Sequence, residues 1–357
     1  EMTSSLVGSE MCIRDSSIVV YWLSILVFSI SCSKDKEQKD LVVDLLREAK
    51  DSVGYSVFVD SIKYINLELT DSCLIGRITD MAISRNRMFI FDEQQQTIWV
   101  FDRDGKYLNK IYRKGEGPGE YAYINHFEYD ERKNQIVVLS PWQQTLLFYT
   151  PEGKYLKTVR VEMKPDDFKV CPQGGFILSN SGLDEPTAGV YYVNDSGQEM
   201  KCLVKRKSNH LVYLTFEWEL CSYGDIINFM APNFDNTVYH FRNRELSIEY
   251  PFSMKPDLKH DYEETVSLQN FEDFIRTTYL EGEKWIWATY WSSGDGLRIF
   301  IYSKEIGDYW IGKTIVNDFD GKEVGRRTSI TGDNTFVTWS ESENPDENPV
   351  VSILYLK

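Results

Sequence analysis

An internal repeat is the feature that most restricts how this chain of 357 residues can fold. The segment TIWVFDRDGKYL at Thr97–Leu108 returns 48 residues later as TLLFYTPEGKYL at Thr145–Leu156. Looser copies follow at Val190–Met200 and Thr237–Leu246. Each copy joins two apolar, alternating runs through a polar turn with Gly or Asn, which is the pattern of a β-hairpin. Such a period predicts an array of similar β-units.

Two more short strands are expected between successive hairpins, for example INHFEYD at Ile124–Asp130 and QIVVLS at Gln135–Ser140. Four antiparallel strands in roughly 45–55 residues make a unit of the size of a propeller blade. We therefore predict an all-β, six-bladed β-propeller with four antiparallel strands per blade over residues 55–357. The blades are expected at Asp80–Arg113, Tyr123–Glu162, Asp166–Arg206, Val212–Met254, Phe271–Asp318 and Arg326–Lys357.

The last of these units is one strand short, and an early segment has no unit of its own. Tyr55–Thr70 reads as a strand, so we expect it to complete the last blade and close the ring. Closure removes the exposed sheet edges of an open array. Short helices are expected at Leu41–Ala49 and within Asp261–Arg276.

The N-terminal segment has the pattern of an export signal. Ile18–Ile30 is an apolar run of 13 residues, too short to span a bilayer but typical of a signal-peptide core. Ser31 and Cys32 follow, as in a bacterial lipobox, so we predict that residues 1–32 are a signal peptide with its lipobox and that the mature chain begins at an acylated Cys32. Residues 33–54 are expected to form a polar tether. An uncleaved anchor or a plain signal peptide is the alternative. Residues 1–16 resemble the translation of a sequencing adaptor, so we expect them to be foreign and exclude them from the fold.

Charge and cysteine content exclude some classes of function. The formal net charge is −16, and no basic stripe is present, so nucleic acid is not an expected partner. The six cysteines show neither a CxxC pair nor metal-ligand spacing with histidine. The last four, Cys73, Cys171, Cys202 and Cys221, are consistent with disulfides in an oxidising compartment or with buried free thiols.

Several motifs resemble those of one known family. The segment Ile62–Met81, the hairpin that follows it and the loop KGEGPGEY at Lys114–Tyr121 resemble the NHL-like six-bladed β-propeller lipoproteins of Bacteroidota, as does FDNTVYHF at Phe234–Phe241. The resemblance implies a propeller fold and a location in the bacterial cell envelope, as an outer-membrane lipoprotein that is periplasmic or surface-exposed. It implies no particular reaction.

Polar residues near the expected inner strands are candidates for a metal site. Oxygen ligands of this kind suit calcium. Asp and Asn are also ordinary turn residues, so no cofactor is predicted, and calcium is the ion to consider. The candidates are Asp80, Asn125, Asp167, Asn228 and Asp333.

Candidates for ligand binding come from aromatic and histidine side chains. The alternation in WIWATYW places Trp285, Trp287 and Trp291 on one face of a strand, where they would stack on a sugar or peptide or pack between blades. His126 and His240 fall on expected strands and are candidates to face the channel.

No Ser-His-Asp order or GxSxG turn supports acyl transfer. We expect a lipid-anchored binding or scaffold module with membrane contact through its lipid and a protein, peptide or glycan ligand. The alternative is a calcium- or zinc-dependent hydrolase or lyase that uses the channel. Convergence of three or more carboxylates, amides or imidazoles on the inner strands would favour the enzyme.

Overall fold

The computed structural model describes most of the chain from residue 42 to its end. The described residues are 42–181, 188–205, 220–230, 237–249, 253–255, 275–322, 324–325, 327–331, 335–340, 344 and 347–357. Residues 40–357 form one compact unit. No helix of the described residues is long and apolar enough to cross a membrane.

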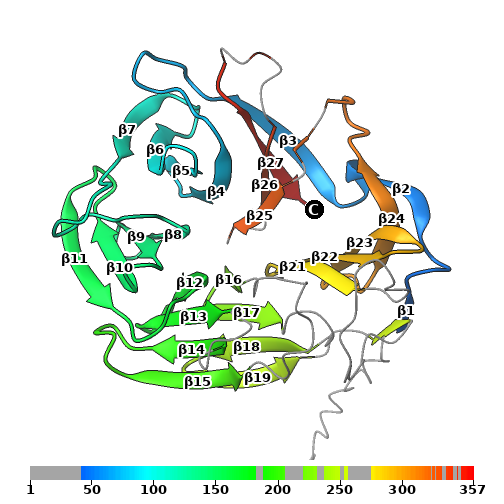
Figure 1. The fold of residues 1–357 in the computed structure, drawn as a ribbon. Helices are drawn as coiled ribbons and strands as arrows, with labels where there is room; N and C mark the ends of the chain where they lie inside the picture. The colour runs from blue at the N-terminus through cyan, green and yellow to red at the C-terminus, as the bar shows by residue number, and fades with distance from the viewer. Residues whose placement is uncertain are drawn as a thin grey trace, which may run out of the picture. The chain divides into compact units, whose positions relative to one another are not determined.

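Six sheets are arranged as the blades of a propeller, as the repeat predicts (Figure 1). Each has four antiparallel strands, and one is extended by a fifth, parallel strand. The first strand of each blade contacts the first strand of the next, in a circle that runs from β4 through β8, β12, β16, β21 and β25 back to β4. These inner strands therefore line the ring axis, and their side chains are brought together from all parts of the sequence.

The strand bounds agree with the units expected from the sequence. Blade 1 comprises β4 (Ile78–Ile83), β5 (Arg87–Asp92), β6 (Thr97–Asp102) and β7 (Tyr107–Ile111). Blade 2 comprises β8 (His126–Asp130), β9 (Gln135–Ser140), β10 (Thr145–Tyr149) and β11 (Tyr155–Arg160). Blade 3 comprises β12 (Asp167–Val170), β13 (Phe176–Asn180), β14 (Gly189–Val193) and β15 (Met200–Lys205).

The second half of the ring follows the same order. Blade 4 comprises β16 (Leu220–Tyr223), β17 (Ile226–Met230), β18 (Val238–Arg242) and β19 (Glu245–Glu249). Blade 5 comprises β21 (Ile275–Glu281), β22 (Trp285–Ser292), β23 (Gly296–Ser303) and β24 (Tyr309–Val316). Blade 6 comprises β25 (Arg327–Thr331), β26 (Thr335–Ser340), β27 (Val350–Leu356) and the early strand β3 (Val59–Asn66).

The ring is closed by β3, as predicted. This strand pairs with the last strand β27 in antiparallel register from Asn66 opposite Val350 to Val59 opposite Leu356. Its Ile65 packs with β27 in one apolar cluster, and Val59 packs with the residues of a second. The two ends of the propeller are thus held in a single sheet.

The chain joins the ring earlier than the sequence indicates. β2 (Lys50–Gly54) adds a parallel fifth strand to the outer edge of blade 5, beside β24. Before it, β1 (Val42–Asp44) pairs in parallel with β20 (Ser253–Lys255), and the buried side chains of Val43 and Leu45 pack with Met254. The expected boundary of the tether at Tyr55 is therefore too late.

One of the two expected helices is wrong, and the other lies largely outside the described residues. From Val42 onward, where the structure describes this segment, it forms the strand β1 and a turn, with Val43 and Leu45 fully buried beside β20. Of Asp261–Arg276, only the last two residues are described, and they begin β21. The only helical element among the described residues is the short 3₁₀ turn η1 (Tyr55–Val57).

Apolar side chains fill the seams between blades. The middle strands are buried along nearly their whole length, because each sheet is covered by a neighbouring blade on both faces. Phe89 and Phe91 of blade 1, for example, share a cluster with Phe127 and Ile136 of blade 2. Among the described cysteines, Cys73, Cys171, Cys202 and Cys221 carry free thiols, and only Cys202 is exposed.

Two glycines at the same place in the repeat allow a matched test of ring closure. Gly105 and Gly153 both adopt a positive φ, at 87° and 83°. A Cβ on Gly105 would lie 2.3 Å from the backbone oxygen of Asn66, whereas on Gly153 the nearest heavy atom would be 3.6 Å away.

We expect Gly153→Ala to cost about 1–2 kcal/mol of unfolding free energy through backbone strain alone. Gly105→Ala should cost clearly more, because its methyl group also displaces the end of the closing strand. Urea unfolding of the two variants measures the difference. Equal losses would show that the contact between Gly105 and Asn66 does not tighten the ring.

Candidate functional site

Three ionisable side chains from three blades meet at the ring axis. Asp80 lies on β4, His126 begins β8, and Asp167 begins β12. His126 Nδ1 lies 2.6 Å from Asp80 Oδ2, and His126 Nε2 lies 3.3 Å from Asp167 Oδ1. We refer to these residues as the three-blade cluster.

Strand alternation explains why these side chains face the axis. Neighbours along the strand point the other way, so that Met81, Phe127 and Phe168 are buried in the seams. The side chains of the cluster remain between 17% and 20% exposed. The cluster is therefore a lining of the channel and not part of the apolar core.

The imidazole of His126 is held in its charged form by the two carboxylates. Burial disfavours the imidazolium, but attraction to Asp80 and Asp167 outweighs this effect and raises the pKa of His126 to about 9. Burial likewise acts against the Asp80 carboxylate, yet His126 lowers the pKa of Asp80 overall. At neutral pH the ring of His126 is therefore an imidazolium that lies between the side chains of Asp80 and Asp167.

A second ion pair lies beside the cluster. Two residues farther along the same strands, Lys169 Nζ lies 2.8 Å from Glu128 Oε1. Glu128 also accepts a hydrogen bond from the backbone N–H of Val170. Burial opposes the charge on Lys169, but Glu128 and Asp167 outweigh it and raise its pKa. Two basic side chains thus lie among three acidic ones on the inner strands of blades 1–3.

This arrangement does not form a metal site. The carboxylates of Asp80 and Asp167 face different nitrogens of one ring, so the three groups do not converge on a common point. Within the described parts of the chain, no group of three or more His, Cys, Asp or Glu side chains could hold a metal ion.

The sequence analysis names all three residues of the cluster but assigns them to two different roles. Asp80 and Asp167 are candidates for calcium and His126 for a ligand, whereas the structure brings all three into one ion cluster. Asn125 donates a hydrogen bond to the backbone oxygen of Asp166. Asn228 is buried in blade 4. Asp333 and Cys32 lie outside the described residues.

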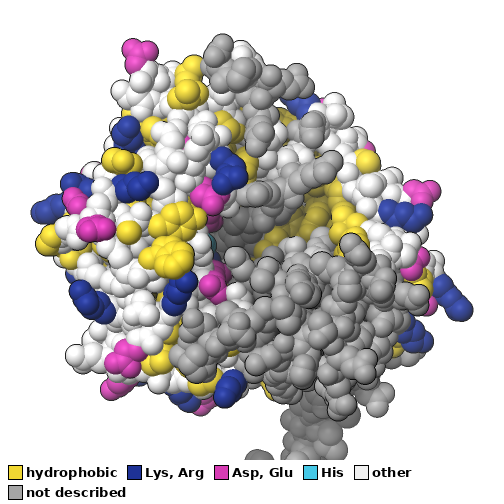
Figure 2. Space-filling model, viewed as in Figure 1, with side chains coloured by type: hydrophobic (Ala, Val, Ile, Leu, Met, Phe, Trp, Pro, Cys, Tyr) yellow, Lys and Arg dark blue, Asp and Glu magenta, His cyan; other side chains and the backbone are white. Residues whose placement is uncertain are grey.

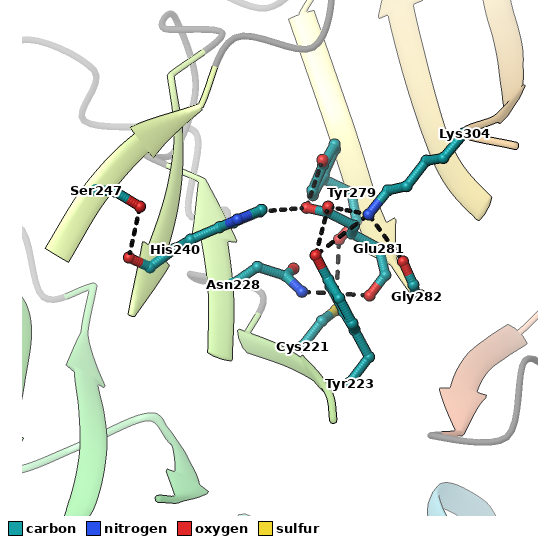
Figure 3. A network of polar contacts seen from close by, with 9 residues as sticks. All are labelled: Cys221, Tyr223, Asn228, His240, Ser247, Tyr279, Glu281, Gly282 and Lys304. Atoms are coloured by element: carbon teal, nitrogen blue, oxygen red, sulfur yellow. Dashed lines mark hydrogen bonds and ion pairs between the residues drawn. The ribbon is translucent and has the colours of Figure 1, made fainter. Parts of the chain in front are cut away.

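A second polar network lies between blades 4 and 5 (Figure 3). Its centre is Glu281, the last residue of β21, whose side chain is 3% exposed. One carboxylate oxygen contacts Lys304 and accepts from Tyr223, at 3.2 Å from the tyrosine hydroxyl. The other lies 3.0 Å from His240 Nε2 and accepts from the hydroxyl of Tyr279 at 2.9 Å.

Every group around Glu281 is engaged with another group of the network. Lys304 also donates to the backbone oxygen of Gly282 and to the hydroxyl of Tyr223. Asn228 donates to the backbone oxygen of Glu281 at 3.2 Å. Burial opposes the Glu281 carboxylate, but the bond from His240 and the charge of Lys304 lower its pKa. These contacts join blades 4 and 5, and among the described residues the buried side-chain oxygen of Asn228 is left without a hydrogen-bond partner.

The tryptophans of β22 have different surroundings. Trp285 is 3% exposed, with its ring 6.1 Å from Trp310 and 6.2 Å from Phe58. Trp287 is partly buried, with its ring centroid 5.6 Å from that of Phe336 on blade 6. Both pack in the seam between blades 5 and 6, and Trp291 is partly exposed farther along the strand.

Sequence reasoning missed Glu281, Lys304, Glu128 and Lys169. Each is a single charged residue on or beside a strand. Strand alternation was the only signal for two of them, because it places Glu128 on the same face as His126 and Lys169 on the same face as Asp167. Nothing in the spacing of Glu281 and Lys304 relates them to His240.

Comparison with known proteins identifies the family and supports the fold. The model of the domain of unknown function DUF4934 matches residues 41–353. A Bacteroides fragilis protein described as exported has an 18% identical sequence and a TM-score of 0.69, with 89% of this chain and 99% of that chain covered. A DUF4221 member from Bacteroides vulgatus is 8% identical, with a TM-score of 0.53 and coverage of 84% and 97%. No curated protein matches the chain.

The match to the family model extends over most of the sequence and over all six blades. The chain therefore belongs to the DUF4934 family, with the fold of a six-bladed β-propeller.

Proposed function

We propose that this protein is an exported, lipid-anchored propeller of the bacterial cell envelope that binds a ligand or partner and carries out no chemistry in its channel. Its similarity to an exported Bacteroides protein supports export. The apolar run before Ser31 and Cys32 supports anchoring through an acylated cysteine, as in the NHL-like lipoproteins that the sequence resembles.

The observation that carries the non-catalytic role is the mutual pairing of the three-blade cluster. An imidazole must be neutral to act as a general base, yet Asp80 and Asp167 favour the protonated form of His126 at neutral pH. The ring lies between the two carboxylates, with Nδ1 2.6 Å from Asp80 and Nε2 3.3 Å from Asp167. Three inner-strand groups do meet, as the alternative of an enzyme requires, but they compensate one another instead of facing a substrate.

A closed ring whose inner-strand ionic groups pair with one another is suited to present loops. Propellers place recognition on the loops that join strands at the two ends of the ring, because the blades themselves are buried against one another. We infer that binding takes place on these loops and not in the channel.

The test of this role combines metal titration with activity assays. Purified protein is titrated with calcium and zinc by calorimetry and assayed against esters, lactones and glycosides. We expect no stoichiometric metal binding and no turnover. Turnover that Asp80→Asn abolishes would assign the channel to catalysis and contradict the proposal.

The anchor is tested separately with Cys32→Ala. We expect the full-length protein to fractionate with membranes and the variant to be released, because a thioether-linked lipid is the proposed attachment. Membrane association that survives the substitution would contradict lipid anchoring, and it would leave the binding role intact.

A further inference from the structure

The repeat provides an internal comparison for one exposed loop. The loop between the second and third strands reads DEQQQT at Asp92–Thr97 in blade 1 and SPWQQT at Ser140–Thr145 in blade 2. Gln96 and Gln144, at equivalent positions, both adopt a positive φ, at 54° and 52°. The two loops therefore share one turn geometry.

Within this shared geometry, blade 2 places Trp142 where blade 1 places Gln94. The side chain of Trp142 is 69% exposed, more than any other large hydrophobic side chain of the described residues. Gln94 is exposed as well, so the turn forms without an aromatic side chain. The turn therefore does not require an aromatic side chain at this position, and an exposed indole offers a flat apolar face to a ligand.

Polar groups with fixed positions surround this indole. Lys164 Nζ lies 3.8 Å from the centroid of the Trp142 ring. The amide oxygen of Gln143 accepts hydrogen bonds from Ser140 at 2.8 Å and from the backbone N–H of Ala122 at 3.1 Å. These bonds leave the amide N–H donors of Gln143 without a partner among the described residues.

The polar surface continues from blade 2 onto blade 1. The hydroxyl of Tyr123 donates to Glu93 at 3.2 Å, and Glu93 forms an ion pair with Arg77. Figure 2 shows hydrophobic side chains gathered over blade 2, at the rim of the central hollow, with charged side chains beside them. We call Arg77, Glu93, Tyr123, Trp142, Gln143 and Lys164 the rim patch.

We propose that the rim patch binds a carbohydrate, with one sugar ring stacked on Trp142. A pyranose has a C–H face that packs on an indole and an edge of hydroxyl groups that both donate and accept. The N–H donors of Gln143, the ammonium of Lys164 and the carboxylate of Glu93 match those hydroxyls. This inference rests on the proposed function and names its ligand class.

A peptide suits the rim patch less well. Peptides that bind without a deep pocket usually add a strand to an exposed sheet edge. The rim patch lies mainly on loops at the ends of strands, and an apolar side chain stacked on Trp142 would leave the donors of Gln143 unused. A protein contact is the competing outcome that the experiment must detect.

The experiment is calorimetry of the purified propeller with cellopentaose, mannopentaose, chitopentaose and pentagalacturonate. We expect at least one of these sugars to bind. Trp142→Gln should weaken that binding at least about tenfold, because it removes the stacking platform. The variant should fold normally, since it restores the residue that blade 1 carries at this position. Ile306→Gln is the matched control. It removes another exposed hydrophobic side chain, 63% exposed, from a turn at the other end of the strands, and it should leave binding unchanged.

Three results would overturn the carbohydrate assignment. They are the absence of binding by all four sugars, equal binding by wild type and Trp142→Gln, and self-association of the propeller that Trp142→Gln abolishes, which would identify a protein contact. Cleavage of a bound sugar would instead contradict the non-catalytic role and leave the site assigned. The failure of one proposal is thus distinguishable from the failure of the other.

Discussion

Removal of residues 55–70 is expected to abolish the folded monomer. The deletion takes away β3, which pairs with β27 along its whole length, and also Phe58, which is fully buried. Contacts between the two ends of the ring are lost as well, including the bond from the backbone N–H of Lys357 to the oxygen of Phe58. Blade 6 would keep three strands and expose the apolar edge of β27, which favours edge-to-edge aggregation.

Size-exclusion chromatography with light scattering and circular dichroism measure the outcome. The matched control is deletion of residues 1–39, which lie outside the compact unit that begins at residue 40 and should leave a folded monomer. A soluble monomer with a cooperative unfolding transition after removal of residues 55–70 would show that the ring does not depend on its closing strand.

The architecture was predictable because each blade carries its own local signal. The hairpin at Thr97–Leu108 and its copy at Thr145–Leu156 fix the period, and the missing strand of the last unit indicates what Tyr55–Thr70 must do. The strands β1 and β2 carry no such signal. Their partners β20 and β24 are more than 200 residues away and pair with them in parallel, so no turn and no shared hairpin pattern relates them.

The candidate site was predictable in its members and not in its chemistry. Asp80, His126 and Asp167 occupy corresponding inner strands of successive blades, which the period reveals. Whether two carboxylates and an imidazole hold a metal or pair with one another depends on their angles at the axis and on small differences in the distances between them. Trp142 was not among the predicted site residues for another reason. Only the geometry of the two turns shows that Gln94 is its equivalent in blade 1 and that the turn forms without an aromatic side chain.

Replacement of His126 is expected to produce the largest loss of stability among single substitutions at the axis. In His126→Gln, the carboxylates of Asp80 and Asp167 lose the cation that lies between them. Loss of one partner of a buried ion pair typically costs about 3–5 kcal/mol. Lys169 also attracts both carboxylates, so we expect a loss near the lower end, at about 3 kcal/mol, when unfolding is measured at pH 6.

The same substitution should change how stability depends on pH. The pKa of His126 is about 9 in the folded protein, compared with 6.5 for an unperturbed histidine. Because the folded value is the higher one, protonation stabilises the fold fully below pH 6.5, and this contribution is lost as the pH rises through 9. Wild type should therefore lose about 3 kcal/mol relative to His126→Gln over this range, and the two unfolding free energies should converge above pH 9.

Urea unfolding followed by tryptophan fluorescence at pH 6 and pH 9.5 measures both effects. Other groups titrate in this range, but they do so in both proteins, so the difference between the two curves isolates His126. For instance, burial raises the pKa of the Cys73 thiol to about 11, which destabilises the fold of either protein at alkaline pH. Lys133→Gln, which removes an exposed ion pair with Asp195, serves as the control and should run parallel to wild type within roughly 1 kcal/mol. If the unfolding free energies of wild type and His126→Gln changed in parallel with pH, His126 would not be charged at the axis. That result would contradict the non-catalytic role proposed for the channel.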